Sequence, residues 1–260
     1  MVPAVTSVSA PERVVDHLQE TPDGPLRVLH HTPLALYVEA AGRCVGVVAP
    51  AAAQVPCALR VSDAAVLAVE DPSPYVVRGT LYLTGIPLRV GRFVDVRAPR
   101  IELGRSPCQA ASPAHAGERP PLPHEAGLAA LSPLPARLDP AAVRHLVGRG
   151  PGLTPLGDDV LAGWLAVLWA TGRLDDETTA TVRAALPRTT MLSATLLDCA
   201  LHGEVLPELA AYLSTVEGPA EPPRSVAVAA LMRVGHSSGT GLWWGARHAL
   251  DVLSREPAAA

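Results

Sequence analysis

The chain lacks lysine entirely, because all 21 of its basic residues are arginine. This absence excludes a P-loop lysine, a lysine Schiff base and a lysine general base. Any chemistry must therefore come from Asp, Glu, His, Arg, hydroxyl groups, the four cysteines or backbone amides.

The chain also lacks an excess of positive charge and a long apolar run. Its formal net charge of −4 and isoelectric point near 6.1 argue against nucleic acid or an anionic membrane as the main partner. Gly, Pro or charged residues interrupt every apolar stretch, and the first residues show no basic region followed by an apolar one. We therefore expect a cytoplasmic protein without a signal peptide.

Paired cysteine motifs are absent as well. Cys44, Cys57, Cys108 and Cys199 are far apart and form no Cys-x-x-Cys pair, so we expect reduced, mostly buried thiols. Neither these cysteines nor His30-His31 have the ligand spacing of a structural zinc site. The sequence thus predicts no structural zinc site.

What the chain does have is 260 residues with 48% hydrophobic content, enough for a substantial core. A Ser-x-x-Glu capping box at Ser9 predicts a short helix over residues 9–19. Short Val-, Leu- and Tyr-rich segments then recur up to residue 103, separated by turn residues, and indicate an antiparallel sandwich or small barrel. We predict strands over residues 26–30, 34–40, 44–49, 65–69, 75–84, 86–90 and 92–96.

Residues 104–136 are rich in Pro, Ala and Ser and predict a linker or mobile loop, with His115 and His124 solvated. From Asp139, an N-cap followed by proline, the pattern is helical almost throughout. We expect helices near residues 139–147, 158–171, 175–186, 189–201, 206–215, 224–234 and 241–254. The predicted fold class is therefore α+β, with a strand-rich domain (1–103), the linker (104–136) and a helical domain (137–260).

The segment from Gly148 to Gly163 reads Gly-Arg-Gly-Pro-Gly-Leu-Thr-Pro-Leu-Gly-Asp-Asp-Val-Leu-Ala-Gly and leads into a buried apolar helix. Its glycines free the backbone, its prolines restrict it, and two carboxylates fall near a helix start. It is either a ligand loop or a turn with an N-cap. The candidate ligand-binding and catalytic residues here are Gly150, Gly152, Thr154, Gly157, Asp158 and Asp159.

A second glycine-rich junction precedes the last helix, at Val234-Gly235-His236-Ser237-Ser238-Gly239-Thr240-Gly241. Successive amides near a helix N-terminus form a concavity suited to phosphate or carboxylate. His236 is a candidate acid, base or hydrogen-bond donor, and its alternative is a capping or packing role. The candidate residues here are Gly235, His236, Ser237, Ser238 and Gly239.

The two junctions resemble each other. Residues 157–163 align with residues 239–245, with the same separation between the flanking glycines. We hypothesise that both helices start at a common pocket and that their glycines allow close approach; a coincidental match is the alternative. Asp159 aligns with Gly241, so any carboxylate function falls on the first junction alone.

A third polar segment, residues 188–193, lies between the two junctions. Thr189, Thr190 and Ser193 fall at a helix start and one turn into it, where their hydroxyls can face the same pocket. Arg188 beside them has the planar fork that pairs with an anion. The alternative is that one of the threonines simply caps the helix.

These three motifs together resemble one bacterial family, formerly a domain of unknown function, that includes the AllH-type subunit of oxamate carbamoyltransferase from anaerobic allantoin degradation. The resemblance is strong from about Asp139 to Leu253, while the strand-rich half agrees only in character. In the family pattern an aspartate often occupies the position of Gly241 here, and this departure argues against a two-carboxylate mechanism.

The resemblance implies a subunit that works with an FdrA-like protein and a third subunit. The implied reaction is carbamoyl transfer between oxamate or a similar amide and phosphate, with carbamoyl phosphate made or used. Asp158, Asp159 and His236 are then the candidate catalytic residues, and Mg²⁺ is a candidate cofactor. The alternative is a non-catalytic metabolite-binding or scaffolding protein.

Overall fold

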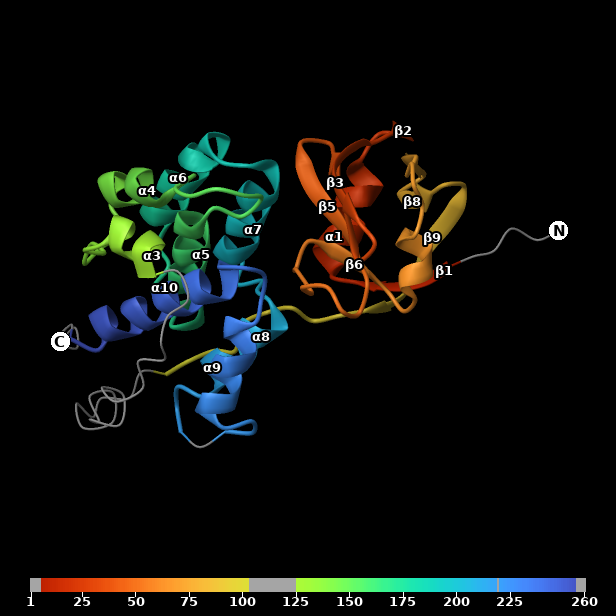
Figure 1. Cartoon of the computed structure of the whole chain (residues 1–260). Helices are drawn as coiled ribbons and strands as arrows, with labels where there is room; N and C mark the ends of the chain where they lie inside the picture. The colour runs from red at the N-terminus through yellow and green to blue at the C-terminus, as the bar shows by residue number, and fades with distance from the viewer. Residues whose placement is uncertain (1–5, 103–124, 219, 256–260) are drawn as a thin grey trace. The chain divides into compact units, whose positions relative to one another are not determined.

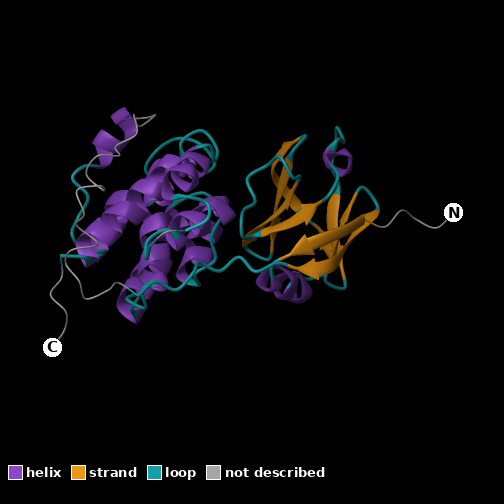
Figure 2. Ribbon diagram, turned by 90° about the horizontal axis from the view of Figure 1, so that it is seen from below, coloured by secondary structure: helices purple, strands orange, loops and turns teal. Residues whose placement is uncertain are grey.

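The computed structural model describes residues 6–102, 125–218 and 220–255, in two compact units that comprise residues 1–96 and 97–260. Strands dominate the first unit and helices the second (Figure 2). The predicted fold class is therefore confirmed. Most of the segment predicted as a linker, with Cys108, His115 and His124, lies outside the described residues.

The first unit is a single nine-stranded sheet that curls into a nearly closed barrel (Figure 1). The strand order is β2-β7-β8-β9-β1-β6-β5-β4-β3. The strands are β1 (Thr6–Ala10), β2 (Gly24–Pro25), β3 (Arg27–Thr32), β4 (Ala35–Ala40), β5 (Arg43–Val48), β6 (Ala58–Val61), β7 (Pro74–Val77), β8 (Thr80–Leu83) and β9 (Ile86–Phe93). Most neighbours are antiparallel, but β1 runs parallel to β9 and β5 runs parallel to β6.

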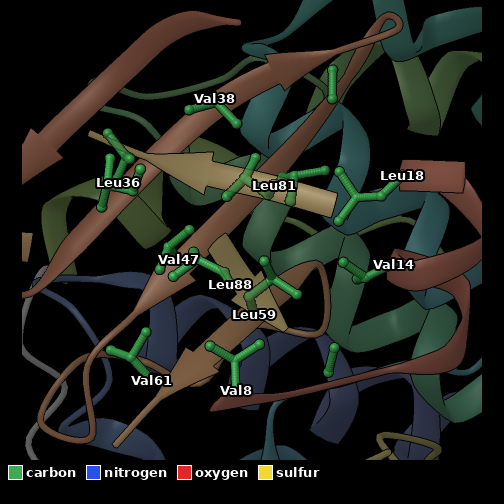
Figure 3. Packing of buried hydrophobic residues seen from close by; sticks show 14 of the residues in the cluster. Val8, Val14, Leu18, Leu36, Val38, Val47, Leu59, Val61, Leu81 and Leu88 are labelled. Atoms are coloured by element: carbon green, nitrogen blue, oxygen red, sulfur yellow. The ribbon is translucent and has the colours of Figure 1, made fainter. Parts of the chain in front are cut away.

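The barrel interior is filled by aliphatic side chains that alternate along the strands. Helix α1 (Glu12–Glu20) contributes Val14 and Leu18 to the same core (Figure 3). The labelled strand residues of this core are Val8, Leu36, Val38, Val47, Leu59, Val61, Leu81 and Leu88. The barrel is thus a packed core.

Three local predictions in this unit were wrong. Ser9 belongs to β1, and α1 follows Pro11 without a side-chain cap, because strand pairing with β6 and β9 overrides the capping-box pattern. The strand predicted over 75–84 is a hairpin, which turns where Arg78 and Gly79 adopt positive φ. Residues 64–67 form a 3-10 turn, η1 (Ala64–Leu67), capped by Asp63.

The second unit is built of short helices around one buried helix. Asp139 caps α4 through a side-chain oxygen, as the sequence predicts, and Asp175 caps α6 in the same way. The helical elements are α3 (Glu125–Leu131), α4 (Pro140–Leu146), α5 (Leu156–Ala170), α6 (Asp176–Ala185), η3 (Leu186–Arg188), α7 (Met191–Leu201), α8 (Pro207–Ser214), α9 (Arg224–Met232) and α10 (Ser238–Leu253).

Helix α5 is the centre of this unit and is buried from Leu156 to Val167. Its sequence is apolar on all sides, which predicts a helix surrounded by protein. It packs most extensively against α10 and then against α7 (Figure 1). None of the described helices is both long enough and apolar enough to cross a membrane.

Candidate functional site

The structure brings the three polar segments together at the N-terminal ends of α5, α7 and α10. The hydroxyls of Thr154 and Ser238 lie 2.9 Å apart, although 84 residues separate them. The Thr190 hydroxyl donates to the carbonyl oxygen of Leu153 at 2.5 Å. We call residues 148–159, 188–193 and 235–241 the loop cluster.

Asp158 fastens two of these segments to each other. Its Oδ1 accepts a hydrogen bond from the Gly148 amide at 2.8 Å, and its Oδ2 accepts one from the Thr189 hydroxyl at 2.5 Å. Burial raises the pKa of Asp158, while hydrogen bonds from Thr189, Gly148 and Ser193 act in the opposite direction. Asp158 lies in the first turn of α5, but it accepts a hydrogen bond from an amide of the preceding loop and does not cap its own helix.

Asp159 is in a different environment. Its side chain is 6% exposed and lies against α10, where a Cβ built at Gly241 would come 2.7 Å from the Asp159 Cβ. Burial raises the pKa of Asp159 well above its ordinary value, a hydrogen bond with Ser238 lowers it, and the charge of Asp158 raises it. Within the described part of the chain, Asp159 Oδ2 is buried without a hydrogen-bond partner.

The amides at the two helix starts are largely used within the chain. The Gly157 amide donates to the carbonyl of Arg149 at 2.8 Å, and the Gly239 amide donates to that of Val234 at 3.0 Å. Both glycines also sit against backbone, since an added Cβ would meet the Leu146 oxygen or the Leu231 oxygen near 2 Å. Their presence is therefore accounted for by close packing.

Gly150 and Gly152 lie on the exposed outer turn of the first loop, with φ of +118° and +94°. A Cβ at Gly152 would meet no atom within 4 Å, whereas a Cβ at Gly150 would lie 2.9 Å from the Leu156 nitrogen. Their amides donate no hydrogen bond to any residue that the structure describes. The outer turn of the first loop is thus the part with unengaged backbone donors.

The similarity between the two junctions has a structural counterpart in the α5–α10 pair. A Cβ at Gly163 would lie 2.0 Å from the Leu242 oxygen, and a Cβ at Gly245 would lie 1.9 Å from the Val160 oxygen. Gly163 aligns with Gly245, and Val160 aligns with Leu242, so the contact is reciprocal. The glycines allow the two helices to approach backbone to backbone.

The other predicted residues divide into buried and exposed groups. Ser193 is buried, and its amide donates to the Thr190 hydroxyl, which caps α7. Arg188 and His236 are exposed, and the Arg188 carbonyl rather than its guanidinium abuts Gly148. Gly235 is exposed at φ +60°, and Ser237 is partly exposed at the start of α10.

The sequence did not single out the Gly148 amide, although it completes the surroundings of Asp158. The left-handed φ of Gly148, +74°, is a general sign of a turn and does not reveal that its amide donates to Asp158. Among the residues described, no group of three or more His, Cys, Asp or Glu is placed to hold a metal ion. Mg²⁺ at Asp158 would have to compete with the two hydrogen bonds that its oxygens accept.

Comparison with known proteins agrees with the resemblance found in the sequence. Residues 146–250 match the family described as "Oxamate carbamoyltransferase subunit AllH". The predicted resemblance is therefore confirmed over residues 146–250, which contain the whole loop cluster. No solved structure matches the chain.

Proposed function

We propose that this protein is a subunit of a carbamoyltransferase-type complex and that its loop cluster binds a small anionic substrate. The observation that carries the proposal is that residues 146–250, which match the oxamate carbamoyltransferase subunit family, contain all three segments that meet in the cluster. The substrates are oxamate or a similar amide, together with phosphate or carbamoyl phosphate.

The exposed side of the cluster supplies hydrogen-bond donors for such an anion. The amides of Gly150 and Gly152 are exposed, and the Thr154, Thr190 and Ser238 hydroxyls lie on adjoining segments. Arg188 and His236 belong to the same segments and add charged or ionisable donors to this surface. Ser237 completes the set at the start of α10.

The proposed chemistry uses these donors to stabilise negative charge. Transfer from carbamoyl phosphate forms a bond between the carbamoyl carbon and the amide nitrogen, breaks the carbon–oxygen bond to phosphate, and moves a proton from that nitrogen to the departing phosphate. Charge develops on the carbonyl and phosphate oxygens, where fixed donors have their largest effect. Asp158 holds the first loop against α7, and Asp159 orients the Ser238 hydroxyl.

The proposal includes partner chains, an FdrA-like protein and a further subunit, because the matching family is defined as a subunit. The decisive assay is oxamate-dependent phosphate release from carbamoyl phosphate by the reconstituted complex. Ser238→Ala and Thr154→Val should each lower the rate by about 10²-fold, the typical effect of removing one donor to a developing oxyanion.

The matched control for this assay is Ser254→Ala, a serine beyond α10 whose hydroxyl donates to the Asp251 carbonyl. It should leave the rate unchanged. Full activity in both cluster variants, with assembly of the complex intact, would remove these hydroxyls from the reaction.

A second function, scaffolding without catalysis, is favoured by one set of observations. Gly157, Gly163 and Gly245 are explained by helix packing, and the Gly157 amide is used internally. In this alternative the cluster orders the helical unit for contact with partner subunits. Activity of the complex that survives disruption of every cluster hydroxyl would favour it, whereas turnover by the purified chain alone would exclude it.

A further inference from the structure

The barrel unit carries a polar cavity that has no part in the proposed function. It lies over β6, β1 and β9, has a volume of about 460 Å³, and is bordered on one side by the loop between β5 and β6. Its polar lining residues are Ser7, Ser9, Gln54, Arg60, Ser62 and Arg92.

Sheet register places the two arginines on the same face. Ser9 pairs with Arg60 of β6 on one side and with Arg92 of β9 on the other. Residues directly opposite each other in neighbouring strands project to the same face of a sheet. The adjacent pair, Val8 and Val61, belongs to the barrel core, so Ser9 and both arginines face outward.

A β-bulge creates this arrangement. Val8 pairs with Val90, but Ser9 pairs with Arg92, so Gly91 is the extra residue of β9. A regular register would place Gly91 opposite Ser9 and would turn Arg92 towards the core face, because a shift of one residue reverses the side chains. Gly91 also makes room for Ser7, whose hydroxyl would lie 2.6 Å from a Cβ at this position.

The border of the cavity is held by internal hydrogen bonds. The Gln54 side-chain amide donates to the carbonyls of Ala49 at 2.8 Å and Ala52 at 2.9 Å. The Arg60 Nη2 donates to the Gln54 carbonyl at 3.3 Å, which orients the guanidinium at the border. The loop and the first arginine are therefore positioned before any ligand arrives.

The charge of the cavity lining is positive. It contains two arginines, three serines and a glutamine, and no carboxylate. Guanidinium groups and hydroxyls are the donors that recognise phosphate and carboxylate oxygens. The volume lies in the usual range for small-molecule sites and exceeds what a single inorganic phosphate needs.

We propose that this cavity is a second anion-binding site, which takes a small metabolite bearing a phosphate or carboxylate group between Arg60 and Arg92. Ser7, Ser9 and Ser62 donate further hydrogen bonds to the same group. The site is independent of the loop cluster, since all of its residues belong to the barrel unit.

Isothermal titration calorimetry on the full chain tests this site, with inorganic phosphate, pyrophosphate and citrate as separate probes. We expect a saturable binding event with at least one probe, separate from any binding at the loop cluster, that is weakened ten-fold or more by Arg60→Gln and by Arg92→Gln and is absent in the double variant. A comparison of the affinities for phosphate and pyrophosphate with the affinity for citrate distinguishes a phosphate ligand from a carboxylate ligand.

Two controls make the result specific. Arg78→Gln removes the same charge at an exposed hairpin turn of the same unit, outside the cavity lining, and should bind normally. Ser238→Ala disturbs the loop cluster and should leave the binding event assigned to the cavity unchanged. Saturation by none of the three probes, or unchanged binding by a double variant with an unchanged circular dichroism spectrum, would overturn the proposal.

Discussion

Gly241 faces Asp159 across the contact between α5 and α10, and a Cβ at Gly241 would lie 2.7 Å from the Asp159 Cβ. The two residues occupy equivalent positions in the aligned junctions. The missing side chain on α10 therefore provides the space in which the carboxylate of α5 is buried. A carboxylate at both positions would require this backbone to shift.

The reciprocal glycine contact predicts a large cost for adding a methyl group. Gly163→Ala and Gly245→Ala should each lower the free energy of unfolding by about 3 kcal/mol or more, because the new Cβ would meet a carbonyl oxygen near 2 Å. Gly152→Ala is the contrast, since it adds only backbone strain at positive φ in open space and should cost about 1 kcal/mol. Urea unfolding of the three variants measures the difference, and equal costs would contradict the packing argument.

The two hydroxyls that join the junctions should be energetically coupled. Thr154→Val and Ser238→Ala each remove one partner of the 2.9 Å contact. A double-mutant cycle should give a coupling energy of about 0.5–1.5 kcal/mol, the usual net contribution of a hydrogen bond. Coupling near zero would mean that the contact contributes nothing to holding the loops together.

Removal of the Asp158 carboxylate should loosen the first loop. Asp158→Ala leaves the Gly148 amide and the Thr189 hydroxyl without their acceptor, at a cost of about 1–3 kcal/mol in unfolding free energy. Asp251→Ala, at an exposed carboxylate on α10, should change stability by less than about 0.5 kcal/mol. Hydrogen exchange of the Gly148 amide should be faster in Asp158→Ala and unchanged in Asp251→Ala. An unchanged exchange rate in Asp158→Ala would show that Asp158 does not hold the loop.

The buried Asp159 carboxyl predicts a pH-dependent stability. Its pKa is raised in the folded protein, mainly by burial, so the folded state holds this proton at a pH where the unfolded chain has released it. The contribution of this group to the free energy of unfolding therefore falls as pH rises from the ordinary pKa of an aspartate through the raised pKa of the folded state. At lower pH the carboxyl is protonated in both states, and this loss of stability is absent.

Asp159→Asn removes this penalty. The variant should gain stability relative to the natural protein as pH rises from 4 to 8, seen as a melting temperature that rises progressively relative to that of the natural protein. Asp251→Asn serves as the exposed control and should show no such trend. A gain that is constant across this pH range would show that burial of the ionised carboxyl is not its source.

Much of the fold was predictable because local chemistry decides it. Asp139 caps α4 as predicted, and the uninterrupted apolar run after Asp159 is the buried α5. The Ser9 capping box failed because Ser9 pairs with β6 and β9 in the sheet, and this pairing depends on strands that are distant in the sequence. The bulge at Gly91 depends on the same long-range register.

The sequence predicted that the segments of the loop cluster lie together, but it did not predict their individual contacts. The spacing from Gly157 to Gly163, repeated from Gly239, marks two equivalent helix starts, and the structure pairs those helices. The sequence did not decide between the two aspartates, because their difference arises from what surrounds each one. The Gly148 amide and the Thr189 hydroxyl engage Asp158, while Asp159 is buried against α10.

The most direct test of the proposed function is a thermal-shift titration of the purified protein with carbamoyl phosphate, phosphate and oxamate, with and without Mg²⁺. A ligand that binds the folded state raises the melting temperature in a concentration-dependent way. We expect a saturable rise that is retained in the Arg60→Gln, Arg92→Gln double variant and that is lost when Thr154→Val or Ser238→Ala is added to this double variant. No saturable rise with any of the ligands in the double variant, or a rise that persists there after either hydroxyl is removed, would contradict binding at the loop cluster.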